Sequence, residues 1–118
     1  MSRLIVLLGV AAMLAATHGA GAADAAGNTR RGAALIAQTG CGACHSIRGI
    51  ANAHGLVGPP LDNIGARTMI AGLLPNTAEN MERWLETPQG IVPGNAMPDM
   101  GLSRRDAADI TAYLEALK

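Results

Sequence analysis

The sequence predicts an all-α fold of three main helices joined by long loops. Two observations support this prediction. Three segments combine a helical spacing of apolar residues with capping residues at their first turns, and the segments between them are rich in Gly and Pro. Loops of this length are unusual in a compact domain unless another group occupies its centre. We therefore expect the helices to surround something other than protein.

The first helix is expected from about Thr29 to Gln38, with Asn28 or Thr29 as its N-cap. Gly40 is expected to end it. Farther along, residues 47–61 are rich in Gly and Pro and have no helical pattern, so we expect a loop there. Residues 63–69 carry only a weak signal for a short helical turn.

The second helix is indicated by the Pro-Asn-Thr sequence at residues 75–77, with Thr77 or Asn76 as the cap and Glu79 favourable in the first turn. Its predicted apolar face consists of Ala78, Met81, Trp84 and Leu85. Pro88 and Gly90 are expected to stop it.

The last helix is expected to open at Ser103, because Ser103 and Asp106 have the spacing of a capping box in which Asp replaces Glu. It is expected to run to Leu117, with an apolar stripe of Ala107, Ile110, Leu114 and Leu117. Between the second and last helices, residues 91–98 are expected to form an irregular loop bracketed by prolines.

The only two cysteines of the chain lie in Cys41-Gly42-Ala43-Cys44-His45. This is the attachment sequence of a covalent c-type haem. Cysteines separated by two residues can each add to one haem vinyl group, and the next residue, His45, can then ligate iron through its imidazole. We expect one haem c per chain, attached through Cys41 and Cys44. Because a domain this small, without any Phe, has little apolar volume of its own, we expect the haem-free chain to be largely unfolded.

Three other interpretations of the motif are weaker. Structural zinc needs four ligands, and His18 and His54 lie at no recognisable ligand spacing from the motif. A thioredoxin-like dithiol follows a strand, whereas the residues before Cys41 have a helical pattern. Chance would produce this arrangement in roughly one of two thousand chains with as many cysteines and histidines.

Residues 1–23 have the pattern of a secretory signal peptide. An apolar run from Leu4 to Ala16 is followed by small residues, and cleavage is expected after Ala22 or Ala23. A retained membrane anchor is the alternative, although the run is short for a bilayer. Since c-type haem is attached outside the bacterial cytoplasm, we expect a periplasmic protein whose residues 24–118 form one haem domain.

A second axial ligand for the iron would come from His54, Met69, Met81, Met97 or Met100. Met97 is preferred, because prolines on both sides restrict its backbone and present the thioether from a loop. Met81 lies on the stripe of the second helix and is more simply a core residue. Met100 is the main competitor, and His54 is expected to lie in its loop without binding iron.

Four segments together resemble class I cytochrome c. They are Cys41 to His45, Gly58-Pro59-Pro60-Leu61, Pro93 to Pro98, and Asp109 to Leu114. They occur in the family's order over nearly all of residues 24–118. The resemblance implies the cytochrome c fold, with His45 as the proximal ligand, Met97 as the distal ligand, and the Pro59 carbonyl accepting the other imidazole N–H.

The resemblance also implies supporting residues. Trp84 falls where the family places an aromatic side chain against the haem, and an ordinary core position is equally compatible. Asn95 and Arg67 are candidates to hydrogen-bond the haem propionates, with solvent exposure the alternative for Arg67. The family packs its first helix against its last, which is expected here through Gly32, Tyr113 and Leu114.

With both axial positions filled by protein, one-electron cycling is the chemistry that remains. We therefore expect an electron carrier rather than an enzyme, in a periplasmic respiratory chain. Its donor would be a bc-type complex or a dehydrogenase, and its acceptor a terminal oxidase or peroxidase. Two alternatives stay open: a haem sensor or peroxidase-like protein in which Met97 dissociates, and an electron-transfer subunit of a dehydrogenase or oxidase complex.

Charge and composition bear on the partners. The formal net charge is +0 and Lys118 is the only lysine, so the lysine-rich docking face of mitochondrial relatives is missing. We expect no nucleic-acid partner, and contact with a membrane only through partner proteins.

Overall fold

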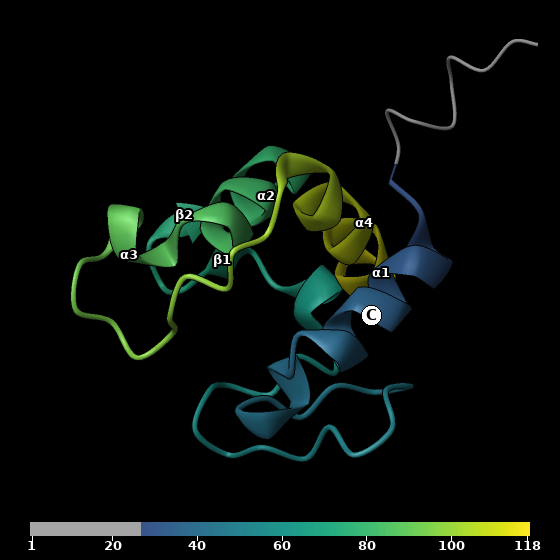
Figure 1. The fold of residues 1–118 in the computed structure, drawn as a ribbon. Coiled ribbons are helices and arrows are strands. Elements are labelled where there is room, and N and C mark those ends of the chain that lie inside the picture. The colour runs from purple at the N-terminus through teal and green to yellow at the C-terminus, as the bar shows by residue number, and fades with distance from the viewer. Residues whose placement is uncertain (1–26) are drawn as a thin grey trace, which may run out of the picture.

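The computed structural model describes residues 27–118 and has the all-α architecture expected from the sequence (Figure 1). The three predicted helices are present as α1, Thr29–Gln38, α2, Ala78–Glu86, and α4, Arg104–Glu115. Within residues 27–118 no helix is long and apolar enough to cross a membrane. The predicted signal peptide, residues 1–23, lies outside the described part of the chain.

The first turns of the helices are capped as their sequences predict. The side chains of Asn28 and Thr77 each accept a hydrogen bond from the backbone N–H three residues on, at 3.0 and 3.2 Å. Ser103 and Asp106 form a complete capping box at the start of α4. That helix ends at Glu115, two residues before the predicted end at Leu117.

A fourth, short helix, α3, spans Pro88–Ile91. The sequence predicted Pro88 only as a stop for the second helix and placed Ile91 in the following loop. Both functions of proline operate here: α2 ends before Pro88, and Pro88 then occupies the first position of α3, where its missing N–H costs nothing.

The remaining segments are mostly loops. Two 3-10 turns, η1 at Cys41–Ala43 and η2 at Ile64–Ala66, flank the predicted loop of residues 47–61. A hairpin that the sequence did not predict pairs β1, Met69–Ile70, with β2, Leu74–Pro75. Strands of two residues are too short to show an alternating pattern.

Helix α4 packs against both α1 and α2, and Figure 1 shows α1 lying directly beside it. Gly32 makes the closest approach, since a Cβ at this position would lie 2.0 Å from the Asp109 carbonyl oxygen. The packing of the first helix against the last that the resemblance implies is present, with Gly32 in the contact. Tyr113 packs against the core, and its hydroxyl also donates a hydrogen bond to the Arg48 carbonyl at 2.7 Å and lies against Gly49.

The core lies between these helices and the loop of residues 47–61. Its buried apolar residues are Ile36, Ile47, Ile50, Ala53, Ile64, Ile70, Met81, Leu85, Ala107, Ile110, Leu114 and Leu117. The predicted stripe of α4 is therefore buried in full. On α2, Met81 and Leu85 are buried, but Ala78, the first residue of the helix, is exposed, so the predicted apolar face is wrong at this position.

Candidate functional site

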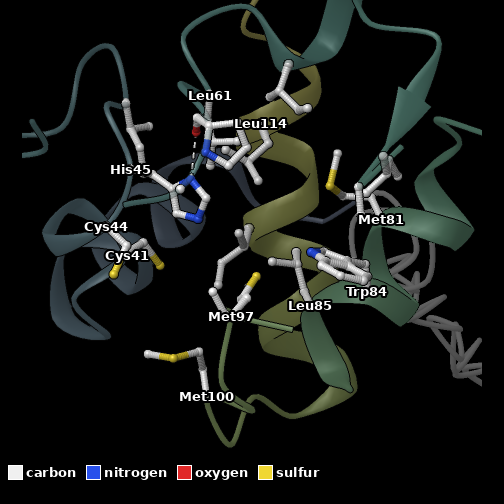
Figure 2. Close-up of a pocket in the computed structure, with 18 of the residues that line it drawn as sticks. Cys41, Cys44, His45, Leu61, Met81, Trp84, Leu85, Met97, Met100 and Leu114 are labelled. Atoms are coloured by element: carbon white, nitrogen blue, oxygen red, sulfur yellow. Dashed lines mark hydrogen bonds between the residues drawn. The ribbon is translucent and has the colours of Figure 1, made fainter. Parts of the chain in front are cut away.

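An apolar cavity of about 440 Å³ opens within this core (Figure 2). Its walls come from α1, the motif at residues 41–45, the loop of residues 47–61, α2, α4 and the segment before α4. Aliphatic core residues line much of it, among them Ile36, Ile47, Leu85, Ile110 and Leu114. All the site residues predicted from the sequence also line this cavity: Cys41, Cys44, His45, Pro59, Arg67, Trp84, Asn95 and Met97.

The two cysteines stand on and directly after η1. Gly40 precedes this turn with a φ of 77°, a left-handed conformation that glycine adopts without strain, so α1 can end and the motif can turn back. The His45 N–H donates to the Cys41 carbonyl at 3.0 Å, which tightens the turn. Both thiols are free and face the same cavity.

The imidazole of His45 is held by backbone. Its Nδ1 lies 2.7 Å from the Pro59 carbonyl oxygen, the contact that the resemblance implies. Because a carbonyl only accepts, Nδ1 carries the hydrogen and Nε2 is left as the nitrogen able to bind a metal. Figure 2 shows the ring entering the cavity from the side of Cys41 and Cys44.

Gly58 is a site residue that the analysis of the sequence did not single out by role. Its N–H donates to the Cys44 carbonyl at 2.7 Å, which ties the loop to the motif. A Cβ at this position would lie 2.3 Å from His45 Cε1, so only glycine fits against the ring. In the sequence, the Gly-Pro pair indicates that the backbone approaches another group closely, but it does not show that this group is the His45 ring.

The candidates for the second axial position differ in their burial and in whether they line the cavity. Met97 and Met100 both line the cavity, and Figure 2 shows Met97 reaching into it from the segment before α4. Met81 also lines the cavity but is 3% exposed and belongs to the core. Met69 is exposed, and His54 is exposed and does not line the cavity.

Three further predicted residues have other contacts besides the cavity. Trp84 is half-buried, lines the cavity and packs against the apolar core. The Arg67 guanidinium donates a hydrogen bond to the Pro60 carbonyl. The Asn95 amide is engaged by backbone groups: its Nδ2 donates to the Pro88 and Val92 carbonyls, and its Oδ1 accepts from the Met97 N–H. The roles of Arg67 and Asn95 toward the haem propionates, and the contact of Trp84 with the haem, stay predictions.

The donor set fits a haem c. Two free thiols at the attachment spacing, an imidazole with Nε2 free and a thioether meet in one apolar cavity. Cys41 and Cys44 would hold the porphyrin covalently, and His45 and Met97 would ligate the iron. When bound, the haem supplies reversible one-electron cycling. Within residues 27–118, no three His, Cys, Asp or Glu side chains are grouped so as to hold a metal ion by themselves.

A c-type haem domain in an all-α fold is the class of protein that this cavity and its residues define. The chain belongs to the Cytochrome c family, whose pattern matches residues 29–118. Membership in this family implies a haem c and electron transfer.

Individual relatives fall into two groups. A cytochrome c of Euglena viridis is 31% identical over 107 residues, covering 78% of this chain and 99% of that protein. Cytochrome c oxidase subunit 2 of Alkalihalophilus pseudofirmus is 37% identical over 89 residues, covering 75% of this chain and 25% of the subunit. The same subunit of Bacillus subtilis is 31% identical over 93 residues, covering 75% of this chain and 26% of the subunit. The chain thus spans about a quarter of the length of these oxidase subunits.

Proposed function

We propose that this protein carries single electrons in a periplasmic respiratory chain, through a haem c ligated by His45 and Met97. The observation that carries the proposal is that an imidazole and a thioether line the same apolar cavity as the two free thiols. With His45 and Met97 both ligating the iron, no position would be open for a substrate. A soft thioether ligand and an apolar cavity both favour Fe(II), which suits the oxidising end of the chain.

A terminal oxidase is the proposed acceptor, and a bc-type complex or a dehydrogenase the proposed donor. Support for the acceptor comes from the likeness to oxidase subunits. Leu56 and Val57 are 91% and 73% exposed, and Val57 lines the cavity, so an apolar contact surface lies beside the site. Small surfaces of this kind suit short-lived redox complexes. The periplasmic location rests on the predicted signal peptide.

Optical spectra of the purified protein test the site and the chemistry together. Ferric protein should show the weak charge-transfer band at the red edge that marks methionine sulfur on iron. Met97→Ala should lose this band, and Met100→Ala, in the same cavity, should keep it. The native protein should cycle reversibly between Fe(III) and Fe(II) and should not bind carbon monoxide at neutral pH.

Other outcomes identify the competing functions. Carbon monoxide binding by the native ferrous protein would favour a haem sensor or peroxidase-like protein and overturn the carrier proposal. Loss of the band in Met100→Ala instead would move the ligand to Met100. The likeness to oxidase subunits also favours a second candidate, an electron-transfer subunit of an oxidase complex. Gel filtration of a periplasmic extract decides between them, because a diffusible carrier elutes at its own mass.

A further inference from the structure

Gln89 fixes the segment that carries Met97 without touching the cavity itself. We call residues 92–98 the Met97 loop. Gln89 Nε2 donates to the Asn95 carbonyl at 2.9 Å and to the Met97 carbonyl at 2.7 Å, and Gln89 Oε1 accepts from the Gly94 N–H at 3.0 Å. Both amide hydrogens and the amide oxygen of this side chain are therefore used on one loop.

The Met97 loop depends on such bonds because it has no helix or strand to satisfy its peptide groups. Asn95 provides the complement: its Oδ1 accepts from the Met97 N–H at 2.7 Å. The N–H of Met97 is thus held by Asn95 and its carbonyl by Gln89. Two amide side chains fix the backbone on both sides of the thioether.

The backbone of Gln89 is itself held in place by its neighbours. It is the second residue of α3, next to Pro88, which is among the most fully buried residues of the chain. Its own N–H donates to Asp99 Oδ1 at 3.2 Å, beyond the Met97 loop. One glutamine of α3 therefore binds the Met97 loop at residues 94, 95 and 97 through its side chain, and the following residue 99 through its backbone N–H.

We propose that Gln89 is a positioning residue that holds Met97 ready to ligate the haem iron and opposes its displacement. The proposal rests on the proposed function, because it takes Met97 as the axial ligand. Residues that orient a ligand from outside its coordination sphere typically change metal binding by about 10- to 100-fold when altered. Without these hydrogen bonds, the Met97 loop would lose conformational entropy each time the thioether binds the iron. This cost would weaken binding by Met97 and so favour a competing ligand.

Displacement of Met97 by imidazole tests the proposal in ferric holoprotein, followed by loss of the methionine band. Gln89→Leu removes all three side-chain hydrogen bonds and should tighten imidazole binding by about tenfold or more. Gln89→Glu keeps the shape and the bond from Gly94 but places a carboxylate oxygen, which cannot donate at neutral pH, against the Asn95 and Met97 carbonyls, so it should tighten imidazole binding in the same direction. The control is Gln38→Leu, at the only other glutamine, which is exposed at the end of α1 and should leave imidazole affinity within twofold of native.

Two failures can be told apart. If Gln89→Leu and Gln89→Glu bind imidazole no more tightly than Gln38→Leu while the native protein shows the methionine band, the positioning role of Gln89 is wrong and the proposed function stands. If the native protein lacks the band, the assignment of Met97 fails first. Far-UV melts of each holoprotein guard against a global effect: a fall in the melting temperature of Gln89→Glu without tighter imidazole binding would also overturn the proposal.

Discussion

At the scale of single residues, the site depends on how closely backbone approaches the His45 ring. The Pro59 carbonyl accepts a hydrogen bond from the ring, and Gly58 leaves room for the ring because it has no side chain. A hydrogen bond from the second nitrogen of a ligating histidine fixes the ring orientation and raises its basicity. The Gly58-Pro59 pair would therefore act on a bound haem iron through His45 rather than by contact.

Gly58→Ala should disturb this arrangement. The added Cβ would lie 2.3 Å from His45 Cε1, so the ring or the loop must move. Overpacking of this kind costs about 1–3 kcal/mol of unfolding free energy. We expect that loss in denaturant titrations of the holoprotein, together with an altered ferric spectrum.

The matched control for Gly58→Ala is Gly72→Ala. Gly72 has a φ of 67° with open space around it, so alanine there should cost about 1–2 kcal/mol through backbone strain alone. The spectrum of Gly72→Ala should be native. An unchanged spectrum in Gly58→Ala would contradict the positioning argument.

At the scale of elements, the crossing of α1 and α4 is fixed by shape and by charge. Gly32 lets the helix backbones approach, and Arg31 bonds both Asp106, at 2.6 Å, and the buried Asp109. The Asn28 N–H also donates to Asp109 at 2.6 Å. Burial raises the pKa of Asp109, but the bonds from Arg31 and Asn28 outweigh it and hold this pKa below its ordinary value of 3.8. The Ser103 and Arg31 bonds lower the pKa of Asp106.

Acid should loosen this crossing. A carboxyl group whose pKa is lowered in the folded state contributes stability that is fully present above its unfolded pKa and is lost as the pH falls through the folded value. Stability should therefore fall below about pH 4. Asp109→Asn should lower the melting temperature at pH 7 by about 5 °C or more and flatten the decline below pH 4. Melts between pH 2 and 7 measure both, with exposed Glu79→Gln on α2 as the control. If the stability of Asp109→Asn falls as steeply below pH 4 as that of the native protein, groups other than Asp109 cause the decline.

The helices also show which features of the fold can be predicted from local sequence. The caps at Asn28, Thr77 and Ser103 were predictable because each involves a side chain and an N–H three residues away. Helix α3 was not, because the local sequence around Pro88 is equally compatible with a stop and a start. The Arg31 and Asp109 pair joins residues 78 apart, and neither carries a local signal of its partner.

At the scale of the whole molecule, the core and the site are one region. Eight of the buried core residues also line the cavity: Ile36, Ile47, Ile64, Ile70, Met81, Leu85, Ile110 and Leu114. A bound haem would therefore complete the core as well as occupy the site. Voids inside a core forfeit the contacts of the side chains around them.

Removing the haem should consequently abolish cooperative folding. A haem-free chain, prepared as the double variant Cys41→Ala and Cys44→Ala, should show weak far-UV circular dichroism and no cooperative melt, whereas the holoprotein should melt cooperatively. A cooperative far-UV melt of the haem-free chain would show that the protein part of the core suffices.

The sequence by itself determined the attachment motif and the first turns of the three main helices, because each depends on residues close together in the chain, and four short motifs in a fixed order indicated the family. Only the tertiary structure decided which side chains share the cavity, that Gly58 abuts His45, and that Gln89 holds the backbone of Met97. The physical reason is that Gly58 and Met97 lie in loops, where no periodic pattern links a residue to its partner. Their geometry is set by the packing of α1, α2 and α4 around the cavity rather than by local conformational preference.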